Sequence, residues 1–293
     1  MSAIHPCAFR SRIGPDANHG FYPAPLRYRL YLSLACPGCL RIAITHRLLG
    51  LADRIPLTEL PAVPEPDGGY AELRTAYDRT THGYRGPATA PVLADHWTGR
   101  VVSNHAPDIL RDLAVRFRTA GTPELRPPAA EKDIAELARL CDHDITEAAQ
   151  QAGRATAEGP DREAASDTLL TALATLEERL SAGPYVLGDA LTAADVDLWV
   201  TLVRLDTVHR WHLDAEAVHR IAAHPALWSY AKRLLSAPAF GDSLHIDDIT
   251  RRHHARCRGL EAAGAAVRII DWTPDPSAVA RCPGATQEAS VAS

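Results

Sequence analysis

The chain of 293 residues is 46% hydrophobic and 23% charged, with a formal net charge of -5 and a pI near 6.3. This balance is typical of a globular protein, and the acidic excess argues against a general nucleic-acid binder. No apolar run is long enough to span a bilayer, and the first residues lack the apolar segment of a signal peptide. We therefore expect a cytoplasmic chain with room for two domains and with no nucleic-acid or membrane partner.

A strand and a helix are predicted on either side of a cysteine pair. Residues Tyr28–Leu34 place alternate apolar side chains on one face, which predicts a strand. The tetrapeptide CPGC follows at 36–39, and residues 40–50 then show helical spacing that ends at a glycine. A second short strand is predicted at 55–60.

A long segment and a hairpin complete the first predicted domain. Residues 61–87 are rich in Pro, Gly and Tyr and are predicted to form a long functional excursion. Residues 91–103 predict a β-hairpin that turns at Gly99, and Asn104 is expected to cap the helix that follows. The predicted order β-α-β-β-β-α, with a CxxC after the first strand, is typical of a thioredoxin-like domain, which we place at 1–120.

The second half of the chain is predicted to be helical. Residues 121–130 are the best candidate for a linker, and Thr192 and Asp195 form a capping box that opens an apolar helix. The predicted fold class is therefore α/β plus all-α, with a thioredoxin-like thiol-binding domain followed by a helical-bundle substrate domain at 131–255. An extension at 256–293 follows, and its end is expected to be disordered.

The CPGC sequence has the chemistry of a redox pair. The other four of the six cysteines are single, as expected for thiols kept reduced in a cytoplasm. At the first turn of a helix, unpaired N–H groups and the helix dipole lower the pKa of a thiol such as Cys36. Pro37 suits the first helical position, Gly38 leaves the approach open, and Cys39 lies within disulfide reach. We predict that Cys36 attacks and that Cys39 resolves the mixed disulfide.

Two other interpretations of the pair are open at this point. The cysteines could be inert thiols, or they could form half of a zinc site completed by His253 and Cys257, which lie one helical turn apart. Neither interpretation accounts for the placement between a strand and a helix. We therefore favour the redox pair and expect no metal.

A proline opens the predicted hairpin within the tripeptide Ala90-Pro91-Val92. In thioredoxin-like domains the proline at this position is cis, and it turns backbone polar groups toward the thiol ligand. The alternative is an ordinary proline of an edge strand.

Several segments resemble the xi-class glutathione transferases, also called glutathionyl-hydroquinone reductases. The likeness runs from about residue 9 to 254 and rests on RYRLYLSLACP, APVLADHWTGRVVSN, LGDALTAADVDLWVTLVRLDTV, HPALWSYAKRLL and DDITRRHH. It implies the glutathione-transferase fold, a homodimer, and a nucleophile at Cys36. In that family this cysteine attacks the sulfur of a glutathione conjugate and releases a quinol, and a second glutathione clears the resulting disulfide. Arg41 matches the arginine that closes the family's cysteine motif.

Departures from the family pattern fall in the expected active site. The family reads C-P-W-A-H-R where this chain reads CPGCLR at 36–41, so a tryptophan is lost and a second cysteine is gained. After the hairpin the family carries Asn-Glu-Ser, and its Glu and Ser hold the γ-glutamyl end of glutathione. Here the residues are Asn104, His105 and Ala106. Their loss should weaken glutathione binding unless other charge-assisted hydrogen bonds replace them.

The expected substrate pocket is changed as well. The family's closing tyrosine pair, which serves the hydroquinone, is replaced by His253 and His254. The family's tyrosine-bearing helix motif is absent, and Arg154 lies in that region. These three residues are our candidates for contacts with the second substrate.

Three functions follow from these observations. The first is a thiol-dependent oxidoreductase acting on a disulfide or thiol conjugate through Cys36 and Cys39. The second is a tailoring transferase that makes or breaks a C–S bond on a specialised metabolite with a thiol other than glutathione, such as mycothiol. The third is a non-catalytic binding protein that retains the fold.

The two enzymatic functions share their expected partners, a low-molecular-weight thiol and an apolar or quinone-like substrate. The residues expected to contact the thiol are Pro37, Gly38, Arg41, Ala90, Pro91, Val92, Asn104 and His105.

Overall fold

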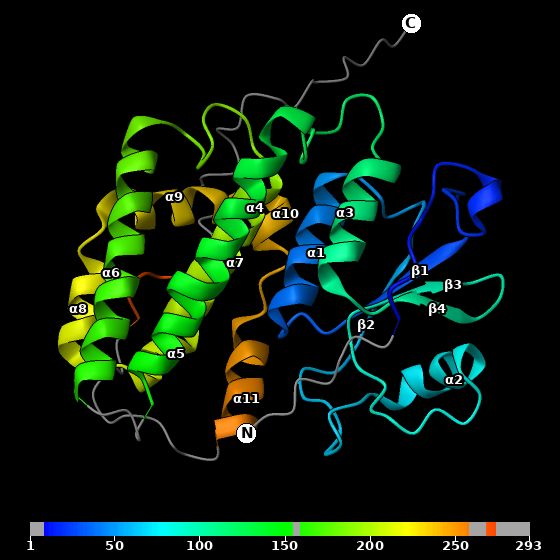
Figure 1. Cartoon of the computed structure of the whole chain (residues 1–293), viewed down its shortest axis with the longest axis horizontal. Coiled ribbons are helices and arrows are strands. Elements are labelled where there is room, and N and C mark those ends of the chain that lie inside the picture. Colours follow the sequence, from blue (N-terminus) through cyan, green and yellow to red (C-terminus); the bar gives the residue numbers. More distant parts are fainter. Residues whose placement is uncertain (1–8, 155–158, 258–267, 274–293) are drawn as a thin grey trace, which may run out of the picture.

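The computed structural model describes residues 9–154, 159–257 and 268–273. Figure 1 shows two parts that lie side by side, a small sheet with its helices and a larger group of helices. The end of the extension at 256–293, which was predicted to be disordered, lies outside the described residues.

A mixed four-stranded sheet forms the centre of the first part. Its strands are β1 (Tyr28–Leu32), β2 (Leu57–Glu59), β3 (Val92–Asp95) and β4 (Arg100–Ser103). The strand order is β2-β1-β3-β4, with β1 parallel to β2 and antiparallel to β3, and β3 antiparallel to β4. The sheet, with a parallel β1–β2 pair and an antiparallel hairpin, has the thioredoxin-like arrangement that was predicted.

The predicted alternation in the first strand is confirmed. Tyr28, Leu30 and Leu32 are fully buried, because they face the core shared by α1 (Pro37–Leu48) and α3 (Ala106–Arg116). The predicted hairpin is confirmed too, and Gly99 at its turn has a φ of 70°, which favours glycine.

The segment at 61–87 contains a helix that the sequence analysis did not predict. Helix α2 (Ala71–Thr80) covers the other face of the sheet, with Leu73 and Tyr77 as its buried side chains (Figure 1). Two apolar residues at i and i+4, set among Pro, Gly and charged residues, give too short a pattern for a helix to be recognised. The observed order is therefore β-α-β-α-β-β-α.

The prediction that Asn104 caps the following helix is wrong. His105 occupies the N-cap of α3, and no side-chain hydrogen bond caps that helix. The Asn104 amide instead accepts a hydrogen bond from the N–H of Phe9 at 3.1 Å and donates one to the Tyr77 hydroxyl at 3.0 Å. Asn104 thus connects the N-terminal segment to α2.

From residue 128 onward, the described regular elements are helical. They include α4 (Glu131–Arg139), a π-helical segment (Leu140–Glu147), α5 (Ala148–Ala152), α6 (Gly159–Ala182), α7 (Ala193–Thr207), α8 (Ala215–Ala222), α9 (Pro225–Leu235), α10 (Pro238–Gly241) and α11 (Ile246–Cys257). Within the described residues, no helix combines the length and the apolar character needed to cross a membrane.

The capping box before α7 is confirmed. The carboxylate of Asp195 accepts hydrogen bonds from the Thr192 N–H at 2.8 Å, from the Val186 N–H at 3.0 Å and from the Tyr230 hydroxyl at 2.9 Å. Helix α7 is almost entirely buried, so this box positions the element around which the helical part packs.

Helix α11 brings the end of the chain back to the first domain. It runs between the helical group and the sheet domain (Figure 1), and its Arg252 reaches the carbonyl oxygen of Ala62. Residues far apart in the sequence therefore meet near the start of α1, where the cysteine pair lies.

Candidate active site

The structure places Cys36 at the N-cap of α1, as predicted. Its backbone is extended, with a φ of -91° and a ψ of 129°, and its carbonyl oxygen accepts a hydrogen bond from the Leu40 N–H at 2.9 Å. Pro37 fills the first helical position, where its missing N–H costs nothing. Cys36 is partly exposed and Cys39 is buried, and both are free thiols.

The pKa values of the two cysteines are shifted in opposite directions. The pKa of Cys36 lies well below its ordinary value, chiefly because the Cys39 side chain donates a hydrogen bond to its thiolate. The cation of Arg252 and the N–H groups of Cys39 and Gly38 act in the same direction, while burial opposes them. The pKa of Cys39 lies well above its ordinary value, because of burial first and then because of the neighbouring Cys36 sulfur.

Two arginines of the helical domain lie near this sulfur, and the sequence analysis missed both. Arg252 on α11 donates hydrogen bonds of 2.9 Å to the Ala62 carbonyl and to the Tyr70 hydroxyl. Arg204 on α7 donates to the Ala35 carbonyl at 3.5 Å, and burial lowers its pKa to about 10 while the Cys36 charge opposes that shift. The arginine-rich segments were visible in the sequence, but their distance from Cys36 along the chain hid the contact.

The proline that opens β3 is cis, as predicted, in the peptide bond from Ala90 to Pro91. Ala90 packs against the same core as Cys36, and Val92 is fully buried in the sheet. The Tyr77 hydroxyl donates to the Thr89 carbonyl at 2.7 Å, which ties the start of this loop to α2. That these residues contact a thiol stays a prediction.

The start of α3 adjoins the start of α1. A Cβ atom built on Gly38 would lie 3.1 Å from the Cβ of Ala106, so the two positions touch. Both positions depart from the family pattern described above, because Gly38 stands where the family has a tryptophan and Ala106 where it has a serine. The two changes therefore affect one small region beside the Cys36 sulfur.

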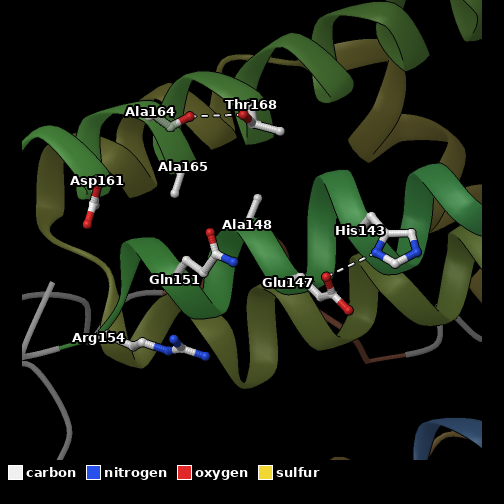
Figure 2. Close-up of a pocket in the computed structure, with 9 residues that line it drawn as sticks. All are labelled: His143, Glu147, Ala148, Gln151, Arg154, Asp161, Ala164, Ala165 and Thr168. Atoms are coloured by element: carbon white, nitrogen blue, oxygen red, sulfur yellow. Dashed lines mark hydrogen bonds and ion pairs between the residues drawn. The ribbon is translucent and has the colours of Figure 1, made fainter.

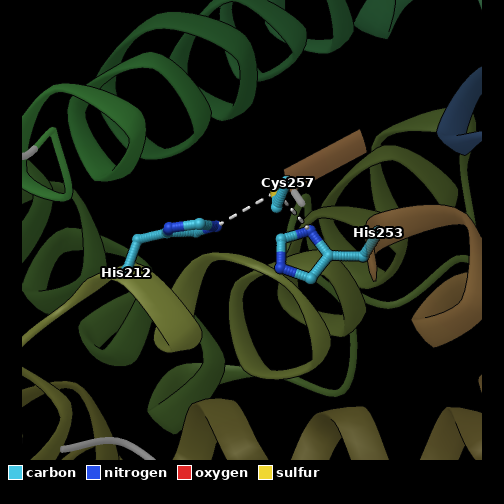
Figure 3. A group of neighbouring side chains, drawn as sticks. All are labelled: His212, His253 and Cys257. Atoms are coloured by element: carbon cyan, nitrogen blue, oxygen red, sulfur yellow. Dashed lines mark hydrogen bonds between the residues drawn. The ribbon is translucent and has the colours of Figure 1, made fainter. Parts of the chain in front are cut away.

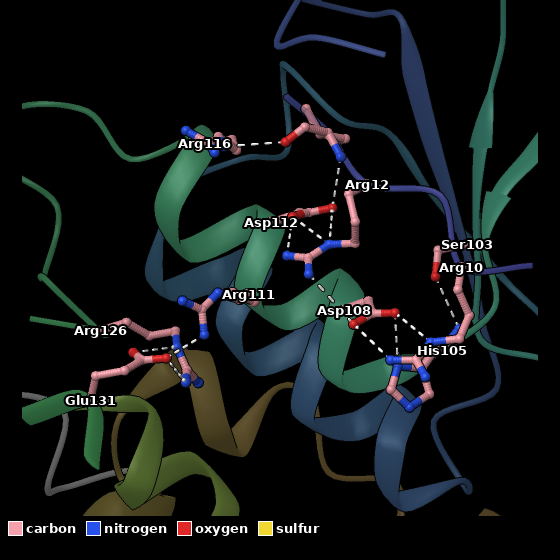
Figure 4. A network of polar contacts seen from close by, with 11 residues as sticks. Arg10, Arg12, Ser103, His105, Asp108, Arg111, Asp112, Arg116, Arg126 and Glu131 are labelled. Carbon is pink, nitrogen blue, oxygen red and sulfur yellow. Dashed lines mark hydrogen bonds and ion pairs between the residues drawn. The ribbon is translucent and has the colours of Figure 1, made fainter. Parts of the chain in front are cut away.

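A network of charges surrounds the first turn of α3 (Figure 4). The Nδ1 atom of His105 lies 3.0 Å from an oxygen of Asp108, which also accepts a hydrogen bond of 2.8 Å from Arg10. Arg12 contacts Asp108 at 3.6 Å and forms hydrogen bonds with Asp112. The pKa of Asp108 is lowered; burial alone would raise it, but the hydrogen bond from Arg10 and the proximity of His105 outweigh burial.

A cavity of about 480 Å³ lies between α3 and α4 next to this network, and His105, Ala106 and Arg41 are among its lining residues. Arg41 forms an ion pair of 3.0 Å with Asp197 on α7 and donates to Thr201 at 3.2 Å. Arg41 therefore joins α1 to the helical domain in this structure. A contact between Arg41 and the thiol stays a prediction.

Two of the three candidate substrate residues lie together on α11, where the ring centroids of His253 and His254 are 5.9 Å apart, and the third, Arg154, follows α5. Arg154 lines a cavity of about 560 Å³ between the π-helical segment, α5 and α6 (Figure 2). His253 is buried on α11 next to Arg252, whereas His254 is exposed and its ring lies 6.2 Å from that of Trp211. Of the three, His253 is the one adjacent in sequence to a residue that acts on Cys36.

The idea that His253 and Cys257 complete a zinc site with the CxxC pair is wrong. Within the described ranges, two groups of three ligand-type side chains have their ligand atoms within 4.8 Å of one another. One consists of His212, His253 and Cys257, and the other of Glu59, His245 and Asp248. Neither group contains Cys36 or Cys39.

Comparison with known proteins gives a consistent result. Residues 159–233 match the family described as the glutathione S-transferase C-terminal domain. The chain is 30% identical over 277 residues to the glutathionyl-hydroquinone reductase YqjG of Escherichia coli. This alignment covers 88% of this chain and 84% of that protein. It is 31% identical over 252 residues to the glutathionyl-hydroquinone reductase PcpF of Sphingobium chlorophenolicum, with coverages of 80% and 79%.

Solved structures agree with these relatives. The glutathione-bound structure of YqjG superposes with a TM-score of 0.75 at 27% identity, covering 89% of this chain and 94% of that chain. A xi-class glutathione transferase from Natrialba magadii superposes with a TM-score of 0.76 at 26% identity, covering 90% and 87%.

A thioredoxin-like sheet domain with a cysteine at the first turn of α1, packed against a helical domain, defines a glutathione transferase of the cysteine type. The chain belongs to the glutathionyl-hydroquinone reductases, the xi class of these enzymes. It is thus a thiol-dependent reductase or transferase, as predicted, and the interpretation as a non-catalytic binding protein is set aside.

Proposed function

We propose that the enzyme reduces a thiol conjugate or disulfide, with Cys36 as the attacking thiolate and Cys39 as the resolving thiol. The observation that carries this proposal is the pair of opposite pKa shifts: the pKa of Cys36 is lowered and that of Cys39 is raised. The sulfur with the lowered pKa is partly exposed, and the sulfur with the raised pKa is buried. Attack and resolution require these two different roles.

In the first step, the Cys36 thiolate attacks the sulfur of the conjugate and forms a disulfide with it. The bond from that sulfur to the leaving group breaks, and the leaving group departs with the electron pair and takes up a proton. With a quinol conjugate as substrate, the quinol part would leave in this way as the free quinol. The cations of Arg252 and Arg204 stabilise the thiolate before the attack.

The second step follows from what the first one changes. Once Cys36 is in a disulfide, it no longer carries the charge that helps to raise the pKa of Cys39. Cys39 then loses its proton more easily, attacks the Cys36 sulfur and displaces the small thiol, which takes up a proton. An external pair of thiols would reduce the resulting Cys36–Cys39 disulfide and return both residues to the free state.

The names of the relatives and the glutathione-bound structure support glutathione as the small thiol. The second substrate would then be quinone-like, as those names indicate. The homodimer, the cytoplasmic location and the further contacts of the thiol with residues of the cis-proline loop are parts of the same proposal, and they rest on the family likeness.

A second candidate, the tailoring transferase with another thiol, is favoured by the start of α3. His105 and Ala106 replace the residues that would hold a γ-glutamyl group, and the nearby carboxylate of Asp108 already contacts Arg10 and His105. A ligand ammonium would therefore have to compete with a guanidinium for that carboxylate. A thiol without a γ-glutamyl group avoids this competition.

Mass spectrometry of the intact protein after exposure to a glutathionyl-hydroquinone conjugate tests the first proposal. The Cys39→Ser variant should retain one glutathione on Cys36, the Cys36→Ser variant should retain none, and Cys141→Ser should behave as the unmodified enzyme. The assay of the Cys39→Ser variant contains the conjugate and only reductants that cannot replace a resolving thiol. Many turnovers under these conditions would refute the role of Cys39.

Binding measurements on a panel of small thiols distinguish the two candidates. Micromolar affinity for glutathione, with weaker binding of thiols that lack the γ-glutamyl group, would favour the reductase. The reverse order of affinities would favour the tailoring transferase.

A further inference from the structure

Two histidines and a cysteine of the helical domain converge on one point (Figure 3). His212 ends the short 3-10 helix η4 (His209–His212), and His253 and Cys257 lie on α11. The Sγ atom of Cys257 lies 3.6 Å from Nε2 of His212 and 3.4 Å from Nδ1 of His253. In Figure 3 the two imidazoles direct these nitrogens at the sulfur from different sides.

Local structure explains why the three side chains meet. His253 and Cys257 are four residues apart on one helix and so share a face, a spacing by which helices present pairs of metal ligands. A Cβ atom on Gly153 would lie 2.6 Å from the Cβ of His212, so only a glycine lets the end of α5 approach η4 this closely. The two imidazole rings are 5.0 Å apart at an angle of 79°, so they do not stack.

We propose that His212, His253 and Cys257 form a binding site for a divalent metal ion of borderline softness, with Zn²⁺ as the preferred ion. With Zn–N bonds of about 2.0 Å and Zn–S bonds of about 2.3 Å, tetrahedral geometry separates a nitrogen from a sulfur ligand by about 3.5 Å. The observed separations of 3.4 and 3.6 Å fit that value. Three protein ligands leave a fourth position for water or a substrate atom.

The ligand types determine the choice of metal. One thiolate and two neutral imidazoles suit zinc and related ions, whereas Mg²⁺ and Ca²⁺ prefer oxygen ligands. The other group of candidate ligands, Glu59, His245 and Asp248, is mainly carboxylate and more exposed, and it serves as the comparison.

The same three side chains can also form hydrogen bonds when no metal is bound. A thiol has one hydrogen and donates it to only one nitrogen at a time, while its sulfur can weakly accept from the other. Metal binding would replace that hydrogen, so that Cys257 becomes a thiolate and one proton is released to solvent for each ion bound. The two states therefore differ in proton content as well as in metal content.

This inference is independent of the proposed reaction at Cys36, and it revises the expectation that the protein binds no metal. The test uses the full chain with Cys36→Ser and Cys39→Ser, so that the redox pair cannot bind metal. After removal of metal by a chelator, Zn²⁺ is titrated in competition with a chromophoric chelator, and Co²⁺ is added in a separate titration.

We expect one Zn²⁺ per chain, release of about one proton per ion at a pH where the free thiol is protonated, and a thiolate-to-cobalt charge-transfer absorption with Co²⁺. Adding Cys257→Ser should abolish the absorption and weaken zinc binding at least about 100-fold. Loss of a residue that only hydrogen-bonds to a metal ligand already lowers metal affinity by up to about 100-fold. Adding His212→Asn should weaken binding comparably. Adding His245→Asn should change neither quantity.

Thermal unfolding without metal shows whether the Cys257→Ser variant folds. In the folded background protein, zinc should raise the unfolding midpoint, and this rise should disappear with Cys257→Ser. The proposal is overturned if zinc binds no tighter to the background protein than to the Cys257→Ser variant. It is also overturned if His245→Asn, rather than Cys257→Ser, removes the binding.

Discussion

Arg252 donates a hydrogen bond of 2.9 Å to the hydroxyl of Tyr70, although 182 positions separate the two residues in the sequence. This contact fixes a guanidinium of the helical domain against the domain that carries the nucleophile. The same cation helps to lower the pKa of Cys36. The thiolate is therefore stabilised by both domains, by its own helix on one side and by α11 on the other.

Replacing Arg252 with methionine should raise the pKa of Cys36. The change removes a positive charge while keeping an apolar stem of similar length, and loss of a nearby cation disfavours the thiolate. We expect this rise to slow alkylation at pH values below the pKa, because a smaller fraction of Cys36 is then thiolate. The pH profile of alkylation by iodoacetamide, followed at Cys36, measures it.

Arg251 provides the control for this change. It lies on the same helix, is exposed, and contacts Asp248 at 3.1 Å. Arg251→Met should leave the pH profile unchanged. An equal shift in both variants would mean that the overall charge, and not the contact made by Arg252, sets the pKa.

Two substitutions at Cys39 separate its hydrogen bond from its redox role. Cys39→Ala removes the donor that is the largest cause of the low pKa of Cys36, so that pKa should rise. Cys39→Ser keeps a donor and should leave the pKa closer to that of the unmodified protein. Alkylation profiles of the two variants, compared side by side, decide this; identical profiles would show that the hydrogen bond is unimportant.

Local patterns in the sequence were sufficient for much of the fold. The alternation in β1, the turn at Gly99 and the capping box at Asp195 each depend on residues close together in the chain, and each was confirmed. Helix α2 was missed because its burial depends on the sheet it covers, which leaves only Leu73 and Tyr77 as a signal.

Only the part of the active site that lies close to Cys36 in the sequence was predictable. The position of Cys36 at the start of α1 follows from the strand before it and the proline after it. Arg204 and Arg252 reach it through the packing of α7 and α11, and no short-range pattern encodes that packing. The convergence of His212 with Cys257 is likewise a product of tertiary structure, although the spacing of His253 and Cys257 was visible.

Restoring the family residues at the start of α3 should restore binding of the γ-glutamyl group. In the double variant His105→Glu and Ala106→Ser, a carboxylate and a hydroxyl return to that position. Each charge-assisted hydrogen bond contributes about 1.5–3 kcal/mol, so glutathione should bind at least about tenfold more tightly by calorimetry. The pair His105→Gln and Ala106→Ser, which lacks the carboxylate, should gain less, and an equal gain would contradict this account.

Removing the Asp195 carboxylate should destabilise the whole helical domain. Asp195→Ala leaves the N–H groups of Val186 and Thr192 and the hydroxyl of Tyr230 without their buried acceptor. We expect a loss of about 3 kcal/mol in the free energy of unfolding, measured by urea denaturation. Asp189→Ala, an exposed carboxylate in the preceding loop, should change it by less than about 0.5 kcal/mol.

Buried His209 should make the folded protein sensitive to acid. Its pKa is lowered from 6.5 to about 3, mainly by burial, so the unfolded chain binds a proton at a pH where the folded chain does not. The stability that depends on its neutral form is therefore complete above about pH 6.5 and is lost as the pH falls from there toward 3. Each unit of difference between the two pKa values corresponds to about 1.4 kcal/mol at the low end of that range.

Replacing His209 with leucine tests this linkage, because leucine fills a similar buried space and cannot be protonated. The free energy of unfolding of the variant should fall less steeply between pH 6.5 and 4 than that of the unmodified protein. Some dependence should persist, since the pKa of buried His46 is lowered as well, mainly by burial. His219→Gln, at an exposed histidine of α8, should retain the full slope; if it flattens the profile as much as His209→Leu does, burial of His209 is not the cause.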